Sequence, residues 1–217
     1  MIIGESKRKM DKALILEKIK KEKIIAVLRI DEENKALNVC KTLIGNGVNC
    51  LELAFNSFSA IKTFKAMLNQ FADKALIGAG TILDDKTAEL AISLGARFIL
   101  SPIFNKSVAD ICNKNNIIYI PGIATPKEAY EAMQYGCNVV KLFPASNFKP
   151  TIIKDLKGPF NNLEIIPFAG INTSNIKNWL DAGAFACGVG NDLIGGYKLD
   201  DYELIYKKCK EYKELIK

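Results

Sequence analysis

One lysine lies within a short apolar run at residues 137–146, CNVVKLFPAS. Pro144 ends the run, which is typical of a buried strand. Lysine is among the residues least often fully buried without a partner. Desolvation of Lys141 by Val139 and Phe143 lowers the pKa of its amine and enlarges the neutral, nucleophilic fraction. For this lysine taken alone, a structural ion pair or a side chain that reaches out to water is the expected interpretation, with an amine placed to attack an electrophile as the alternative.

A glutamate has a similar setting in the run CLELAFN, residues 50–56. Side chains alternate between the two faces of a strand, so Glu52 and Asn56 share one face and the large apolar residues share the other. The same alternation puts Phe143 on the face of Lys141. The sequence therefore predicts one carboxyl group and one amine on the apolar-lined inner faces of two strands.

The residue types that are absent narrow the chemistry. Histidine does not occur in the 217 residues, which excludes Ser-His-Asp and Cys-His catalysis, His-ligated zinc and any imidazole acid or base. The six cysteines form no C-x-x-C pair, so we expect them to be reduced and buried. A lysine and a carboxylate remain, which is what Schiff-base chemistry needs, and we expect neither a metal nor a cofactor.

The net charge of +6 is concentrated near the N-terminus. Residues 1–23 hold eight Lys or Arg against four Asp or Glu. We interpret this segment as a solvated amphipathic helix with Leu14, Leu16 and Ile19 facing inward. The alternative is binding to nucleic acid or an acidic surface, but no nucleic-acid-binding motif follows.

The composition, 49% hydrophobic and 25% charged, is ordinary for a globular protein. No run of about 18 uncharged apolar residues is present, so we expect no membrane span. The charges of the first 23 residues continue through its apolar positions, unlike a secretory signal. The sequence therefore predicts a cytoplasmic protein.

Short apolar runs alternate with segments of helical period from residue 24 onward. The predicted strands cover residues 24–29, 50–55, 75–81, 97–102, 117–122, 138–144, 164–170 and 186–190. One intervening helix is marked by Thr125 as N-cap, Pro126, Glu128 and the stop Gly136. Eight such units predict a single α/β domain over residues 1–217, a (β/α)8 TIM barrel with an extra N-terminal helix. A doubly wound open sheet is the alternative.

A TIM barrel places its site at the carboxyl ends of its strands. The second and sixth strands lie opposite each other and contribute to the same interior layer, so Glu52 and Lys141 point at one small volume. A buried salt bridge that plugs the barrel is the competing interpretation.

Seven segments resemble, in order, motifs of the 2-keto-3-deoxy-6-phosphogluconate (KDPG) aldolase and 4-hydroxy-2-oxoglutarate aldolase family. They are AVLR at 26–29, LELAF at 51–55, IGAGTIL at 77–83, SPIFN at 101–105, PGIATPKE at 121–128, VVKLFPA at 139–145 and GVGNDL at 188–193. The resemblance covers nearly the whole chain from residue 20 onward.

The resemblance implies a metal-independent class I aldolase that cleaves a 2-keto acid to pyruvate and an aldehyde, either glyceraldehyde 3-phosphate or glyoxylate. Lys141 would form the imine and Glu52 would be the general acid and base. Thr81 resembles the contact to the pyruvate carboxylate, and Pro102 and Phe143 resemble the pocket walls. The family also implies a homotrimer.

Three positions depart from the family pattern. Asn56 stands where many members have an arginine that binds a substrate carboxylate, so Arg29 or Asn56 is expected to take that part, with a rim salt bridge as the alternative for Arg29. The segment Pro167-Phe168-Ala169-Gly170 replaces Pro-Thr-Gly-Gly, and its phenyl ring is expected to obstruct backbone approach to a phosphate.

Asn191 replaces a serine of the family and is followed by Asp192, which we expect to cap a short helix. Two functions remain open beside the phosphorylated substrate: an aldolase for an unphosphorylated 2-keto acid, and a degenerate barrel that binds without catalysis. A deoxyribose-phosphate aldolase fits poorly because no second lysine lies on a neighbouring interior strand.

Overall fold

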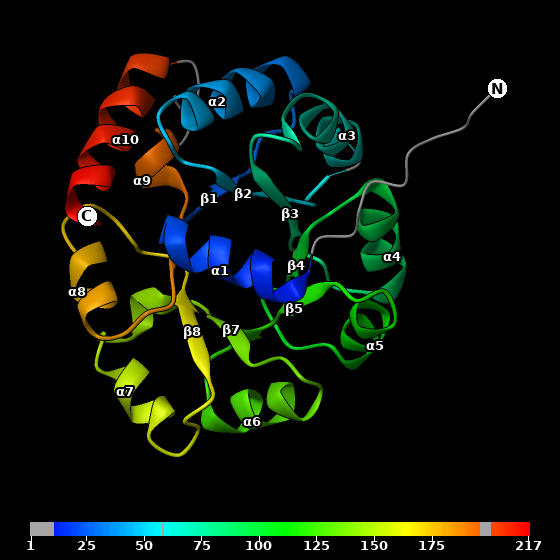
Figure 1. Ribbon diagram of the computed structural model, residues 1–217, viewed down its shortest axis with the longest axis vertical. Helices are drawn as coiled ribbons and strands as arrows, with labels where there is room; N and C mark the ends of the chain where they lie inside the picture. The colour runs from blue at the N-terminus through cyan, green and yellow to red at the C-terminus, as the bar shows by residue number, and fades with distance from the viewer. Residues whose placement is uncertain (1–10, 58, 196–200) are drawn as a thin grey trace.

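The computed structural model describes residues 11–57, 59–195 and 201–217. Its parallel strands curl into a ring, and all helices but the first lie around the outside of that ring in the described part of the chain (Figure 1). The strands are β1 Ile24–Leu28, β2 Cys50–Ala54, β3 Leu76–Gly80, β4 Phe98–Leu100, β5 Ile118–Ile120, β6 Gly122–Ile123, β7 Val139–Leu142, β8 Glu164–Pro167 and β9 Cys187–Val189. The predicted TIM barrel is confirmed; the first ten residues of its basic segment lie outside the described residues.

The helices follow the strands in alternation. They are α1 Lys12–Glu22, α2 Glu33–Gly45, α3 Ser59–Phe71, α4 Asp85–Leu94, α5 Lys106–Lys114, α6 Pro126–Gln134, α7 Ile152–Lys157, α8 Ile176–Asp181, α9 Asn191–Ile194 and α10 Tyr202–Leu215. The predicted capping box of α6 is present, since Thr125 accepts from the backbone N–H of Glu128 and the Glu128 side chain accepts from that of Thr125.

The ring consists of two hydrogen-bonded groups of strands, ordered β5-β4-β3-β2-β1-β9 and β6-β7-β8. A bridge between Phe168 and Gly188 joins β8 to β9. On the other side, the predicted strand 117–122 is divided into β5 and β6 at Pro121, which has no N–H to continue a ladder. The Pro121 carbonyl accepts from the Lys141 N–H at 2.8 Å, so this strand reaches β7 and the doubly wound alternative is excluded.

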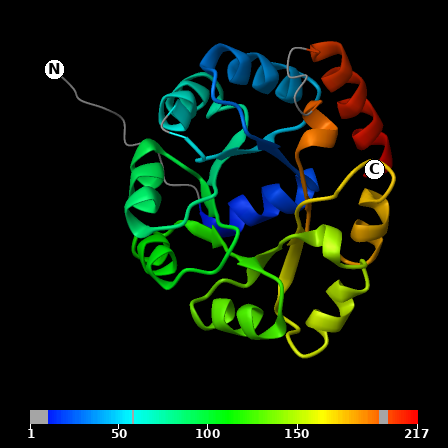
Figure 2. The same cartoon turned by 180° about the vertical axis from the view of Figure 1, so that it is seen from behind.

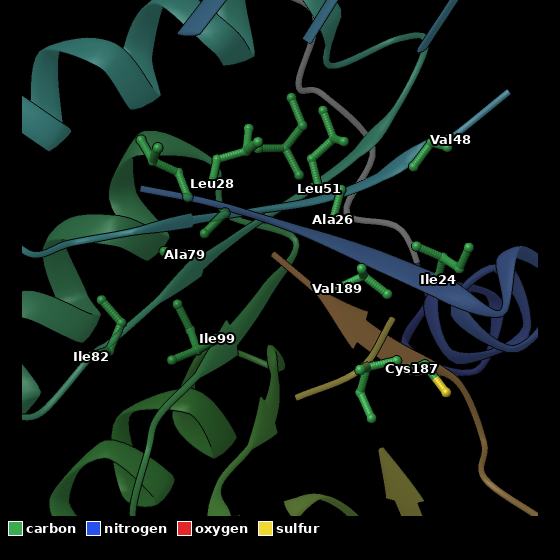
Figure 3. Close-up of a cluster of buried hydrophobic side chains, with 14 of the residues drawn as sticks. Ile24, Ala26, Leu28, Val48, Leu51, Ala79, Ile82, Ile99, Cys187 and Val189 are labelled. Carbon is green, nitrogen blue, oxygen red and sulfur yellow. The ribbon is translucent and has the colours of Figure 1, made fainter. Parts of the chain in front are cut away.

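Side-chain alternation separates two apolar layers. Leu51, Leu53 and Val140 pack in the layer between the strands and the helices, while Cys50 and Val139 pack inside the barrel. Figure 3 shows part of the outer layer, where side chains from β1, β2, β3, β4 and β9 meet. The predicted faces of the second and sixth strands are thus confirmed.

Helix α1 lies across the middle of the ring, in front of it in Figure 1 and behind it in Figure 2. Ile15 and Ile19 are buried and join the cluster inside the barrel, and Leu16 packs partly against it. The prediction that Leu14 faces inward is wrong, because its side chain is 43% exposed. Ile15 and Ile19 are four residues apart and therefore lie on one face of α1, which closes this end of the barrel.

The prediction that the cysteines are buried and form no disulfides is confirmed for all six. No helix in the described ranges is long and apolar enough to cross a bilayer.

Replacing Gly188 by alanine is expected to lower the free energy of unfolding by about 1–3 kcal/mol, the usual range for overpacking. A Cβ there would lie 2.0 Å from Cδ1 of the buried Phe168 ring. Urea denaturation measures the change. Gly45→Ala is the control, since a Cβ at Gly45 meets nothing within 4 Å. Equal effects of the two substitutions would contradict the packing argument.

Candidate active site

A cavity of about 760 Å³ opens where β1, β7, β8 and β9 end. Its lining includes five of the residues that the sequence predicts for the site: Arg29, Lys141, Phe143, Gly170 and Asn191. These residues come from four separate stretches of the chain, and the closure of the barrel brings them together. The cavity lies at the carboxyl ends of the strands, as expected for a TIM barrel.

Lys141 lies in the middle of β7 with its side chain turned into the barrel. The residue is only 5% exposed, and its Nζ lies 5.0 Å from the ring centroid of Phe143 and 4.5 Å from that of Phe168. Burial lowers the pKa of Lys141, Glu52 raises it and Arg29 lowers it, with a net shift below the ordinary 10.5. The two aromatic faces attract the charged form, but desolvation is the larger effect, so the neutral amine is more populated than on a free lysine.

Glu52 lies on β2 and is 1% exposed. Its carboxyl group occupies the space beside Gly80, where a Cβ would lie 1.8 Å from Oε1. Its Oε2 is buried and has no hydrogen-bond partner. Burial raises the pKa of Glu52 above the ordinary 4.5, although Lys141 and Arg29 lower it. The sequence did not single out Gly80 for this part; its bare α-carbon makes room for the carboxyl group.

Glu52 and Lys141 influence each other's pKa, yet no ion pair or hydrogen bond joins them in the described chain. The alternative interpretation, a buried salt bridge that plugs the barrel, requires such a pair and is not supported. A carboxyl oxygen without a partner and a desolvated amine are costly groups to bury. Lys141 lines the cavity and is available to a molecule that enters it, whereas Glu52 lies outside the lining and is close enough to affect the pKa of Lys141.

The position of Phe168 differs from the sequence prediction that its ring obstructs the approach of a phosphate to the backbone. Its ring does not lie over the loop that follows β8; it is buried inside the barrel, against Gly188 and beside Lys141. The loop itself presents Ala169 and Gly170 to the cavity with φ angles of 72° and 80°. The backbone of this loop is therefore open to a ligand, and the ring forms part of the lysine's apolar surroundings.

Other predicted residues are placed differently. Arg29 reaches the cavity and has no ion-pair partner among the described residues, so the rim salt bridge is not formed. Asn56 is exposed and lies outside the cavity lining. Thr81, with a left-handed φ of 60°, directly follows Gly80, and Pro102 packs its carbonyl against Gly122. Neither Thr81 nor Pro102 lines this cavity.

Asp192 does not cap α9 as expected. Gly190 is the N-cap residue, and no side chain caps this helix. The Asp192 Oδ2 instead accepts a hydrogen bond of 2.6 Å from the Tyr212 hydroxyl and lies 3.4 Å from Lys208 Nζ. These partners belong to α10, about twenty residues away, and no local sequence signal marks them.

The cavity also contains residues that the sequence analysis missed, namely Val27, Ile171 and Asn172. Val27 shares the face of Arg29 by strand alternation, so that pattern was sufficient to find it. Ile171 and Asn172 lie in the loop after β8, whose path depends on the rest of the barrel. Within the described ranges, no group of three or more His, Cys, Asp or Glu side chains is placed to hold a metal ion.

Residues 15–207 match the sequence model of the KDPG and KHG aldolases. The chain belongs to this aldolase family. It is a class I aldolase, an aldehyde-lyase.

Two curated aldolases illustrate the similarity. The 2-dehydro-3-deoxy-6-phosphogalactonate aldolase of Escherichia coli is 32% identical over 171 residues, which is 78% of this chain and 83% of the relative. The 2-dehydro-3-deoxy-phosphogluconate aldolase of Haemophilus influenzae is 34% identical over 176 residues, 80% of this chain and 82% of the relative.

Solved aldolase structures superpose over most of the chain. A 4-hydroxy-2-oxoglutarate/2-dehydro-3-deoxyphosphogluconate aldolase has a TM-score of 0.85 at 26% identity, covering 96% of this chain and all of its own. The KDPG aldolase of Legionella pneumophila has a TM-score of 0.80 at 30% identity, and the superposition covers 86% of this chain and 91% of that aldolase. That structure holds pyruvate captured as a covalent carbinolamine.

Replacing Glu52 by glutamine is expected to raise the free energy of unfolding by an amount that grows as the pH rises above 4.5. The unfolded carboxyl group has an ordinary pKa of 4.5 and the folded one a higher pKa. The folded protein therefore retains a proton that the unfolded chain releases, and wild-type stability falls as the pH rises through this window. Urea denaturation between about pH 4 and about pH 8 measures the difference.

Glu128→Gln is a control of opposite sign. Burial acts to raise the pKa of Glu128, but the N–H groups of Ala124 and Thr125 and the Thr125 hydroxyl lower it overall. This variant is expected to lose stability above pH 4.5 and to approach the wild type below it. The same sign for both variants would contradict the raised pKa of Glu52.

Proposed function

We propose that this aldolase cleaves a 4-hydroxy-2-keto acid to pyruvate and an aldehyde, through an imine on Lys141 with Glu52 as general acid and base. The observation that carries the proposal is the pairing of a desolvated amine with a buried carboxyl group whose Oε2 has no partner. The pyruvate carbinolamine of the Legionella relative supports the same chemistry. Conversely, a barrel that only binds would gain nothing from keeping these two costly groups.

The reaction begins when the neutral Nζ of Lys141 attacks the C2 ketone carbon. Glu52, whose raised pKa leaves a larger protonated fraction, donates a proton to the carbinolamine oxygen, and water leaves to give an iminium ion. Glu52 then removes the C4 hydroxyl proton, directly or through a water. The C3–C4 bond breaks, its electrons pass into the iminium to form an enamine, and the aldehyde departs. Protonation at C3 and hydrolysis release pyruvate and restore the amine.

For the substrate we favour a phosphorylated 2-keto-3-deoxy sugar acid, which yields glyceraldehyde 3-phosphate. The relatives from E. coli and H. influenzae are named as aldolases for phosphorylated acids. In this chain the backbone of Ala169 and Gly170 and the side chain of Asn191 lie along the same cavity as Arg29, which has no ion-pair partner among the described residues. They offer N–H donors and a positive charge. Thr81, beside Gly80, is proposed to hold the carboxylate of the pyruvate half.

A second candidate is 4-hydroxy-2-oxoglutarate, which yields glyoxylate. The superposed enzyme that carries both activities in its name supports this candidate. Arg29 would then bind the distal carboxylate in place of a phosphate. Turnover assays with both acids distinguish the two.

Borohydride reduction in the presence of pyruvate tests the imine. We expect the intact mass to gain one reduced pyruvate and peptide mapping to place it on Lys141. Lys141→Met should abolish the adduct, whereas Lys177→Met should not, because Lys177 is an exposed lysine paired with Asp181. No adduct on folded wild-type protein, or an adduct on another lysine, would rule out the mechanism.

Gly80→Ala tests the placement of Glu52. The added methyl group would displace the carboxyl group, which lies against this α-carbon, and a misplacement of about 1 Å is expected to lower kcat about 10²-fold. Gly158→Ala is the control, because a Cβ there has no neighbour closer than 3.6 Å. Unchanged kcat in a folded Gly80→Ala protein would show that the position of Glu52 is not critical.

A further inference from the structure

Asp192 raises a problem for an anionic substrate. Among the described residues, three charged side chains line the cavity, and Asp192 is the one carboxylate of the three. It follows Asn191 at the end of β9, near Arg29 and the loop with Gly170. Like charges a few ångströms apart repel strongly when they are partly removed from water. A free Asp192 side chain would therefore oppose the phosphate or carboxylate that the proposed substrates carry at their distal end.

Two residues of α10 engage this carboxylate. The Tyr212 hydroxyl donates to Oδ2 at 2.6 Å, and Lys208 Nζ lies 3.4 Å from the same oxygen. Neither Tyr212 nor Lys208 lines the cavity. The Asp192 Oδ2 is therefore engaged at the contact between α9 and α10, which lie side by side at the edge of the barrel in Figure 1.

The contact is well suited to hold a negative charge in one place. Tyr212 is fully buried, and burial together with the bond to Asp192 raises the pKa of its phenol, which stays a donor at neutral pH. Lys208 and Tyr212 are four residues apart and share one face of α10, so both reach Asp192 at once. Lys208 also supplies a positive charge that offsets the carboxylate.

We propose that Tyr212 and Lys208 are positioning residues that hold the Asp192 carboxylate away from the distal part of the cavity, and thereby let that part accept an anionic group. The inference rests on the proposed function, because it concerns the distal end of the same substrate. The C-terminal helix, which contributes no side chain to the cavity lining, takes part in substrate selection through Asp192.

The test is the condensation of pyruvate with two aldehydes, glyceraldehyde 3-phosphate and uncharged glyceraldehyde. Tyr212→Phe removes the hydroxyl and keeps the ring, which frees Asp192 to turn toward the cavity. We expect the KM for glyceraldehyde 3-phosphate to rise about tenfold, equivalent to ~1.4 kcal/mol. The KM for glyceraldehyde should change less than about twofold, since an uncharged aldehyde meets no charge repulsion.

Three further variants make the result specific. Asp192→Asn added to Tyr212→Phe should restore the KM for glyceraldehyde 3-phosphate, because the repelling charge is gone. Lys208→Met should also raise the KM for glyceraldehyde 3-phosphate and leave the KM for glyceraldehyde nearly unchanged. Tyr206→Phe is the matched control, a loss of hydroxyl on the same helix where the tyrosine ring contacts Lys210 and not Asp192.

A purely structural role for Tyr212 predicts equal losses with both aldehydes and no rescue by Asp192→Asn, and either result would overturn the inference. Wild-type preference for glyceraldehyde over glyceraldehyde 3-phosphate would also overturn it. Borohydride trapping of pyruvate on Lys141 in the same samples separates these outcomes from failure of the proposed function. Equal losses with both aldehydes, or no rescue by Asp192→Asn, with trapping intact refute only the positioning role, whereas absent trapping in the wild type refutes the proposed chemistry.

Discussion

The site depends on the removal of one amine and one carboxyl group from water inside the barrel. Burial opposes charge on both groups, lowering the pKa of Lys141 and raising that of Glu52, while their mutual attraction acts against both shifts. Because Glu52 and Lys141 are not joined in an ion pair, the amine and the carboxyl group each keep their capacity to bind or exchange a proton. The rest of the fold serves this arrangement: parallel strands supply two inner faces, and α1 closes the far mouth with Ile15 and Ile19.

Glycines give the interior its shape. The bare α-carbon of Gly80 leaves space for the carboxyl group of Glu52, and that of Gly188 leaves space for the ring of Phe168. The ring in turn forms part of the apolar surroundings of Lys141. Each large inward-facing side chain thus lies against a glycine of a neighbouring strand. Because the interior is closely packed, a side chain added at either glycine would displace Glu52 or Phe168.

Much of the fold and part of the site follow from local patterns. Alternation along single strands predicted that Glu52 and Lys141 face inward, and eight strand runs with capped helices predicted the barrel. The same reasoning placed Leu14 inward and gave Asp192 a capping role, and both were wrong. Which face of a helix is buried depends on the surface that the helix packs against, and Leu14 lies off that face. The Asp192 carboxylate accepts a hydrogen bond from Tyr212, which belongs to a helix distant in the sequence.

The sequence by itself determined the strands, the order of the units, the absence of imidazole chemistry and the candidate pair of one amine and one carboxyl group, because these depend on residue type and short spacing. The tertiary structure decided that Arg29 and Asn191 share a cavity, that the Phe168 ring turns inward, and that Tyr212 holds Asp192. Such contacts join residues far apart in the chain. They are set by the closure of the barrel and by steric fit, which no local pattern encodes.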